Sequence, residues 1–257
     1  MQDQLNITLV QTDINWMDSK ATIDYLDKQL ANITTDLIVL PEMFSTGFSM
    51  EPTKIAEPMN GLSVSWMLAK AKELNCAICG SLSIEENNQY FNRFVFVTPN
   101  GIETIYNKKH LFTYGKEDNV YTAGNTFTTI NYKAFKIKPF ICYDLRFPVW
   151  SRNTDNYEIA VYVANWPAKR AFAWNSLLTA RAIENMCYVV AVNRLGTDGN
   201  NLTYQGDSQV IGPLGELLTH CKNQPVMRQI TLYKETITKA RNQFRFLENK
   251  DEFEIKN

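Results

Sequence analysis

Runs of apolar residues predict most of the strands of this chain. Leu5–Val10 alternates apolar and polar side chains, which is typical of a strand with one buried face. Leu37–Leu40 and residues 158–164 are continuous apolar runs, as expected of strands that are covered on both faces. Pro99-Asn100-Gly101 is a turn sequence and predicts a hairpin of residues 90–98 and 101–107. We expect further strands at residues 76–84, 135–141, 188–192 and 227–232.

Segments in which apolar residues recur at helical spacing lie between these strands. In residues 18–30, Ile23, Leu26 and Leu30 lie on one stripe behind Asp18, a suitable N-cap. Residues 62–74 and 171–186 have the same periodicity, and a hairpin and last strand precede a helical tail. No Pro/Gly/Ser-rich linker, charge run or internal repeat interrupts the order. We therefore expect an α/β fold and a single domain over residues 1–257.

Composition excludes several classes of protein. With 26 Lys and Arg against 27 Asp and Glu, the net charge of −1 predicts no general attraction to nucleic acid or to anionic membranes. A hydrophobic fraction of 45% excludes global disorder. No apolar run approaches the roughly 20 residues of a membrane span, and the first residues lack the features of a signal peptide. The odd count of 5 cysteines favours reduced thiols, so we expect a cytoplasmic protein.

Three reactive side chains lie at the ends of predicted strands. Glu42, Lys108 and Cys142 each follow a strand, at the positions where ligands gather in α/β sheets. Because only about 3% of an ordinary thiol is ionised at neutral pH, a nucleophilic cysteine needs a base or a neighbouring cation. Glu42 is a candidate base, and Lys108 is a candidate cation for a developing oxyanion. The two histidines, His110 and His220, leave a Cys-His arrangement open.

The sequence around these residues resembles a known family. Leu-Pro-Glu42, Tyr106-x-Lys108-x-His110-Leu-Phe and Ile-Cys142-Tyr-Asp-Leu-Arg-Phe-Pro are similar, in order and spacing, to three signature segments of the nitrilase superfamily of carbon-nitrogen hydrolases. The similarity extends from the first strand to the Phe-rich C-terminal segment. It implies an α-β-β-α four-layer sandwich and hydrolysis of an amide or nitrile through a covalent thioester or thioimidate.

The resemblance also implies roles for individual residues. Glu42 corresponds to the general base, Lys108 to the cation facing the oxyanion, and Cys142 to the nucleophile. Glu117 occupies the place of the family's second glutamate, and the N–H of Tyr143 is expected to assist Lys108. The family needs no metal or organic cofactor, and its members commonly form homodimers through the sandwich face next to the active site.

Other segments are most similar to the bacterial omega-amidase branch. They are Ala164–Pro167, Thr179–Asn185, Val192–Gly196 and the Phe-rich tail. Omega-amidases release ammonia from the distal amide of 2-oxoglutaramate and 2-oxosuccinamate. The anionic end of such a substrate requires a cation, and an apolar wall suits a small ligand. Candidate substrate contacts are Lys169 and Arg170 for the carboxylate, and Trp166, Phe48 and Tyr114 for the wall, whereas we expect structural roles for Arg146 and for the pair Arg181/Glu184.

Three alternatives stay open at this point. Another amidase of the superfamily, acting on deaminated glutathione, a carbamoyl amino acid or a nitrile, would have the same triad. A non-hydrolytic thiol protein is suggested by Cys76-Ala-Ile-Cys79, although residues three apart in a strand point to opposite faces. A binding protein with an inactive site is the third, against which the complete triad argues.

Overall fold

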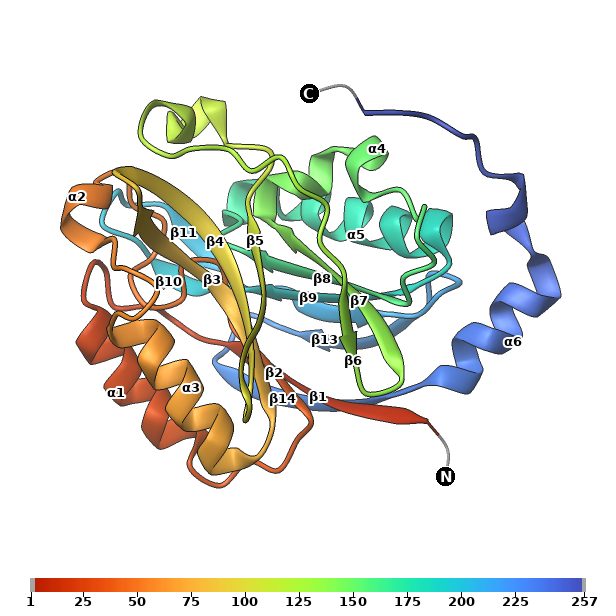
Figure 1. Ribbon diagram of the computed structural model, residues 1–257, viewed down its shortest axis with the longest axis horizontal. Coiled ribbons are helices and arrows are strands. Elements are labelled where there is room, and N and C mark those ends of the chain that lie inside the picture. The colour runs from red at the N-terminus through yellow and green to blue at the C-terminus, as the bar shows by residue number, and fades with distance from the viewer. Residues whose placement is uncertain (1–2, 256–257) are drawn as a thin grey trace.

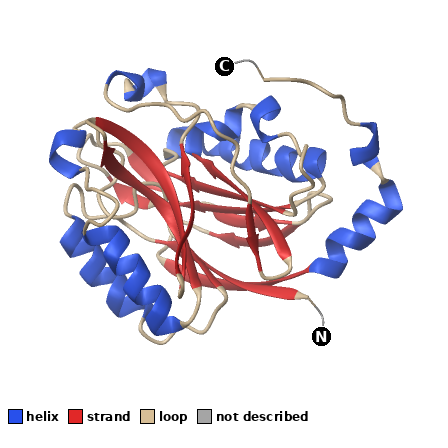
Figure 2. Cartoon of the chain, in the orientation of Figure 1, coloured by secondary structure: helices blue, strands red, loops and turns tan. Residues whose placement is uncertain are grey.

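Two facing sheets form the centre of the molecule in the computed structural model, which describes residues 3–255 (Figures 1 and 2). In each sheet the central strands are parallel and the outer ones antiparallel. The first sheet has the order β14 (Val226–Tyr233), β1 (Gln4–Gln11), β2 (Leu37–Val39), β3 (Ala77–Glu86), β4 (Gln89–Thr98) and β5 (Gly101–Asn107). The second has the order β13 (Leu217–Cys221), β12 (Ser208–Ile211), β9 (Tyr188–Asn193), β8 (Ile159–Ala164), β7 (Phe135–Ile141) and β6 (Ile130–Tyr132).

Helices cover the outer face of each sheet. Helices α1 (Ser19–Leu30) and α3 (Leu62–Leu74) pack on the first sheet, and α5 (Ala171–Asn185) packs on the second together with the short α4 (Pro148–Ser151) (Figure 1). One buried apolar cluster fills the space between the sheets and continues to α5, and a second lies between the first sheet and its helices. The α-β-β-α sandwich that the sequence predicted is thereby confirmed.

Local sequence signals fix the ends of the main helices. The carboxylate of Asp18 accepts a hydrogen bond of 2.9 Å from the N–H of Ala21, as an N-cap residue does. Asn75 ends α3 and Met186 ends α5 in the left-handed conformation. The predicted helices over 18–30, 62–74 and 171–186 thus agree with the structure to within one residue.

Short elements between the strands were not predicted. The hairpin of β10 (Leu195–Thr197) and β11 (Thr203–Gln205) has three-residue strands, which are too short for a periodic signal. The same holds for α2 (Pro52–Ile55) and for the 3₁₀ helices. Those helices are η1 (Thr113–Gly115), η2 (Glu117–Asn119), η3 (Cys142–Arg146), η4 (Ala168–Arg170) and η5 (Phe246–Asn249).

The C-terminal part of the chain extends beyond the sandwich. Strand β14 leads into α6 (Lys234–Phe244), the predicted helical tail, which projects to one side of the molecule (Figure 1). Within residues 3–255, none of the helices has the length and apolar character needed to cross a membrane.

Candidate active site

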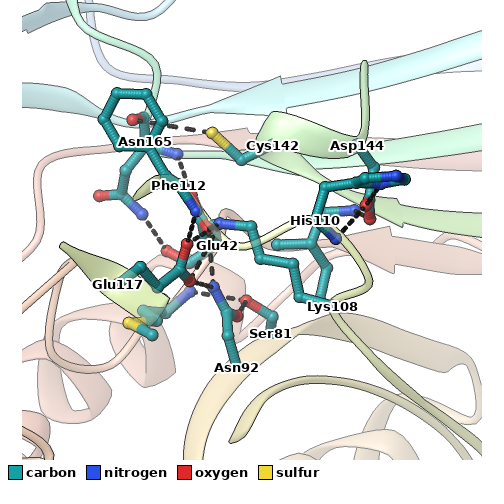
Figure 3. A network of polar contacts seen from close by, with 12 residues as sticks. Glu42, Ser81, Asn92, Lys108, His110, Phe112, Glu117, Cys142, Asp144 and Asn165 are labelled. Carbon is teal, nitrogen blue, oxygen red and sulfur yellow. Dashed lines mark hydrogen bonds and ion pairs between the residues drawn. The ribbon is translucent and has the colours of Figure 1, made fainter. Parts of the chain in front are cut away.

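Strand ends from both sheets bring the predicted catalytic side chains together. Glu42 follows β2 and Lys108 follows β5 in the first sheet, whereas Cys142 follows β7 in the second (Figure 3). Glu117 reaches the same point from η2. Glu42, Lys108 and Glu117 are completely buried, and Cys142 is partly buried.

Lys108 lies between two carboxylates. Its Nζ atom is 2.8 Å from Glu42 Oε1 and 2.9 Å from Glu117 Oε2. Burial by itself would lower the pKa of Lys108, but the charges of Glu117 and Glu42 outweigh it and raise this pKa well above the ordinary value. Burial, together with the charge of Glu42, raises the pKa of Glu117 although Lys108 opposes the change. Lys108 therefore stays an ammonium, and the cluster binds and releases protons as a coupled unit.

The two oxygens of Glu42 have different surroundings. Oε1 accepts hydrogen bonds of 2.8 Å from Lys108 Nζ and of 2.8 Å from Asn92 Nδ2. Oε2 accepts one bond of 2.7 Å, from the main-chain N–H of Asn165. Among the contacts of the described residues, Oε2 thus has fewer donors than Oε1 and has a lone pair left for another proton.

Cys142 stands at a sharp change of chain direction. It is the first residue of η3 and has φ of +43°, a left-handed conformation that a non-glycine residue adopts at a cost. Burial raises the pKa of its thiol well above the ordinary value, and the carboxylate of Glu42 raises it further, while Lys108 acts in the opposite direction. At neutral pH the sulfur is therefore protonated and needs a base.

The surroundings of the sulfur include polar main-chain groups. The Cys142 Sγ atom lies 4.0 Å from the carbonyl oxygen of Asn165, whose N–H contacts Glu42. The N–H of Tyr143 is in the first turn of η3, where main-chain donors have no carbonyl partner within the helix. An oxyanion formed next to Cys142 can use such a donor together with Lys108.

A cavity of about 480 Å³ opens onto Lys108 and Cys142. Glu42 and Glu117, which are completely buried, are not part of its wall. Tyr114, with 85% of its surface exposed, is at the rim, whereas Trp166 is 3% exposed. All six predicted substrate-contact residues line the cavity: Tyr143, Trp166, Phe48, Tyr114, Lys169 and Arg170.

Other residues of the wall were not expected from the sequence. Trp16, Asp198 and Tyr204 line the cavity on the side of the β10–β11 hairpin. The spacing of residues in the sequence does not indicate Trp16. In the structure it packs against two glycines, since a Cβ atom at Gly199 would lie 2.2 Å from its Nε1 atom and one at Gly47 3.0 Å from its ring.

Two arginines differ in their relation to the cavity. Arg146, for which we expected a structural role, lines the cavity with its guanidinium 5.1 Å from the ring centre of Trp166. Arg146 is the last residue of η3, and the sequence did not indicate that this short helix places its side chain at the cavity. Arg181 does brace the site: it pairs with Glu184 at 2.9 Å and donates to the carbonyl of Leu145 in η3 at 2.7 Å.

The histidines contact carboxylates other than those of the cluster. His110 Nδ1 lies 2.8 Å from Asp144 Oδ1, and the main-chain N–H of His110 donates to the same oxygen at 3.0 Å (Figure 3). His220 lies 3.1 Å from Asp207. The structure therefore does not form the Cys-His arrangement that the sequence left open.

The paired cysteines also have no reactive setting. Cys76 lies in the cluster under the helices and Cys79 in the cluster between the sheets, on opposite faces as expected. Burial raises the pKa of Cys76 to about 11 and that of Cys79 still further. Both thiols are therefore protonated at neutral pH, which argues against the alternative of a non-hydrolytic thiol protein.

Comparison with known proteins agrees with this geometry. The carbon-nitrogen hydrolase family matches residues 6–241. The chain belongs to this family. It is accordingly a member of the nitrilase superfamily and a hydrolase of carbon-nitrogen bonds other than peptide bonds.

The similarity to relatives and to solved structures extends over most of the chain. Omega-amidase YafV of Escherichia coli K12 is 44% identical over 253 residues, which cover 98% of each protein. The 2-oxoglutaramate amidase of Bacillus subtilis 168 is 32% identical over 221 residues, covering 82% of this chain and 84% of the relative. The crystal structure of XC1258 from Xanthomonas campestris, a CN-hydrolase superfamily protein with an arsenic adduct in its active site, has a TM-score of 0.96 at 39% identity and covers 98% of this chain and 99% of that one.

Proposed function

We propose that this protein is an omega-amidase that converts 2-oxoglutaramate or 2-oxosuccinamate into ammonia and a 2-oxo dicarboxylate. The observation that supports it most strongly is the buried Glu42–Lys108–Glu117 cluster beside the thiol of Cys142, in which Lys108 and Cys142 line a cavity. The similarity to omega-amidase YafV and to 2-oxoglutaramate amidase supports this choice of amide.

The first half of the reaction forms a thioester. The sulfur of Cys142 attacks the amide carbon while its proton passes to Glu42, and the carbonyl oxygen becomes an oxyanion that Lys108 and the N–H of Tyr143 stabilise. The oxyanion then collapses and the carbon–nitrogen bond breaks. Glu42 returns the proton to the nitrogen, which leaves as ammonia.

The second half releases the acid. Water takes the place of ammonia and attacks the thioester carbon while Glu42 accepts its proton. Collapse of the second oxyanion breaks the carbon–sulfur bond, and the proton on Glu42 returns to the sulfur. One carboxylate thus acts alternately as base and acid, and Glu117 keeps Lys108 in place throughout.

The charges of the cavity favour an anionic substrate. Arg146, Lys169 and Arg170 all line it, and none of them has an ion-pair partner among the described residues. In the part of the chain that the structure describes, the wall contains two acids, Glu51 and Asp198, of which Glu51 pairs with Lys54, so the three cations outnumber the remaining negative charge. A substrate carboxylate would therefore enter a field of positive sign.

A substrate panel tests the proposal against other amidases of the superfamily. Ammonia release is measured with 2-oxoglutaramate, 2-oxosuccinamate, an uncharged amide of similar length, a carbamoyl amino acid and a nitrile. We expect the two 2-oxo acid amides to be hydrolysed fastest and Cys142→Ala to abolish turnover. If another amide is hydrolysed while 2-oxoglutaramate is not, the choice of substrate is wrong but the chemistry stands.

Mass spectrometry of enzyme quenched during turnover tests the chemistry itself. We expect an acyl adduct on Cys142. An adduct on any other residue, or full activity of Cys142→Ala, contradicts the mechanism.

The proposal includes the compartment and the assembly. The reaction needs Cys142 as a free thiol, which a reducing cytoplasm preserves, so we propose a cytoplasmic enzyme. We also propose a homodimer, supported by exposed apolar side chains on the outer face of α5, including Phe172 and Ile183.

A further inference from the structure

Two polar side chains lie inside the first sheet where the mechanism above gives them no role. Ser81 on β3 and Asn92 on β4 are completely buried, and the neighbouring Phe94 and Val95 are apolar and equally buried. A buried amide or hydroxyl is costly unless it is hydrogen-bonded, so the partners of these two residues explain their presence.

A directed chain of hydrogen bonds links these residues to the carboxylates. The N–H of Met43 donates to Ser81 Oγ at 2.9 Å, and Ser81 Oγ donates to Asn92 Oδ1 at 2.8 Å (Figure 3). A main-chain N–H can only donate, so the hydroxyl proton of Ser81 is free for Asn92 and the amide oxygen of Asn92 must face Ser81. The amide nitrogen of Asn92 is thereby turned toward Glu42 and Glu117.

Asn92 and Lys108 together close a ring around the two glutamates. Asn92 Nδ2 lies 2.8 Å from Glu42 Oε1 and 3.1 Å from Glu117 Oε1, and Lys108 Nζ lies 2.8 Å and 3.1 Å from the same two oxygens. The main-chain carbonyl of Asn92 also accepts the N–H of Lys108 at 2.9 Å. Two like charges in a buried site repel each other. Here Glu42 Oε1 and Glu117 Oε1 share the same two donor groups, which stabilise both carboxylates against this repulsion.

We propose that Asn92 is a positioning residue of the reaction, which holds Glu42 and Glu117 together about Lys108 and leaves Glu42 Oε2 as the oxygen that takes the proton of Cys142. The inference depends on the proposed role of Glu42. Because both Asn92 contacts stabilise the ionised carboxylates, their loss makes the pair bind a proton more tightly. The other titratable groups that face the pair are Lys108, Cys142 and Tyr121.

Asn92→Leu replaces the amide by an apolar side chain with the same number and branching of heavy atoms and is the main test. We expect it to lower kcat by roughly 10- to 100-fold with KM within about twofold, since the lost contact is to a charged group that changes during the reaction. The acidic limb of the pH profile of kcat/KM should move upward by about one pH unit. A purely structural role would lower the melting temperature without moving this limb.

Two serine variants control for folding. Ser81→Ala leaves Asn92 in place but removes the donor that orients it, so its effects should have the same direction and smaller size. Ser151→Ala removes a buried hydroxyl of α4, one whose partners are the main-chain carbonyls of Phe147 and Pro148, and should leave the pH profile unchanged. If Asn92→Leu does not fold, the acidic limb of Ser81→Ala decides, and a limb identical to that of Ser151→Ala would overturn the proposal.

Alkylation of Cys142 by iodoacetamide separates this inference from the choice of substrate. The pH dependence of adduct formation, measured by mass spectrometry, needs no turnover. We expect its midpoint to lie at higher pH in Asn92→Leu and Ser81→Ala than in the parent protein. Equal midpoints in all three would overturn the role of Asn92 even if the enzyme hydrolyses 2-oxoglutaramate, and a shifted midpoint would support it even if no tested amide is hydrolysed.

Discussion

The charge of Lys108 stabilises two buried carboxylates that would otherwise face each other without compensation. Removing one partner of a buried ion pair leaves the other charge unpaired, which costs about 3–5 kcal/mol. We therefore expect Lys108→Met to lower the free energy of unfolding at neutral pH by about this amount and to abolish turnover. Urea unfolding measures the loss, and Lys72→Met, the same change at an exposed position of α3, should leave stability nearly unchanged.

The pH dependence of the Lys108→Met variant follows from Glu117. The pKa of Glu117 is already raised by burial, and without the lysine charge it rises further. A carboxyl with a raised pKa destabilises the folded state above that pKa, and the penalty disappears as the pH falls toward the unfolded value of about 4.3. Lys108→Met should thus gain stability relative to the parent between neutral and mildly acidic pH. A constant difference across this range would contradict the prediction.

At the level of single residues, the sequence indicated the reactive groups but not those that orient them. Glu42, Lys108 and Cys142 each follow a strand, and this position alone identified them as candidate catalytic residues. Ser81 and Asn92 lie within strands, where a polar residue normally marks the solvent side. The pairing of β3 with β2 and with β4 places these two residues beside Glu42, and the pairing of β2 with β3 joins segments that are far apart in the sequence.

Asp144 ties the segment after β5 to the helical turn that begins with Cys142. Its carboxylate accepts hydrogen bonds from the hydroxyl of Tyr106 at 2.8 Å, from the N–H of Ile141 at 3.0 Å and from His110. These contacts explain why the motif around Lys108 and the motif around Cys142 contain residues that do not reach the sulfur. Lys108 and Cys142 come from different sheets, and Asp144 fixes their separation.

Tyr106→Phe tests this connection between elements. It removes the Tyr106 hydroxyl, which also accepts from Trp150 Nε1 at 3.0 Å, so we expect a loss of about 1–3 kcal/mol in stability and a lower kcat. Tyr132→Phe removes a tyrosine hydroxyl on the edge strand β6 that binds the carbonyl of Asp36, and it should leave kcat unchanged. Equal kcat values for the two variants would show that the connection does not position the catalytic groups.

The β10–β11 hairpin closes one side of the cavity, and its sequence gave no periodic signal. A methyl group at Gly199 would collide with Trp16, so Gly199→Ala should displace this side chain from the wall. We expect KM to rise by roughly 3- to 30-fold, with a smaller change in kcat, because substrate binding suffers more than the chemistry. Thr203→Ala, on the exposed side of β11, is the control. Steady-state kinetics and tryptophan fluorescence measure both effects, and an unchanged KM would place Trp16 outside the binding site.

On the scale of the whole molecule, the sequence predicted the layers well because each layer has its own period. Continuous apolar runs gave the strands between two covered faces, and a one-sided stripe gave α1. The packing of one sheet on the other depends on residues far apart in the sequence. It was predicted only from the resemblance to a family. The outer surface of α5 is neither core nor ordinary solvent face, since apolar side chains continue there.

This outer surface is where we expect a second copy to bind. Phe172 is 86% exposed and Ile183 is 50% exposed. Their positions are 11 apart, about three helical turns, so they lie on one face of α5. The turn between β12 and β13 packs beside Ile183 at Gly215 and contains the exposed Leu214, and β13 begins with the exposed Leu217. Apolar side chains gathered in this way are typical of interfaces rather than of monomer surfaces.

Ile183→Asp tests the interface directly. A buried unpaired carboxylate in an apolar contact is costly, so the variant should dissociate while the fold of each copy is retained. Light scattering should give twice 29.6 kDa for the parent protein and 29.6 kDa for the variant. Ile102→Asp, at a 43% exposed isoleucine on β5 of the other sheet, should leave the dimer intact. A parent protein of 29.6 kDa in solution would refute the interface altogether. Because α5 begins directly after Arg170 in the cavity wall, we expect dissociation also to raise KM.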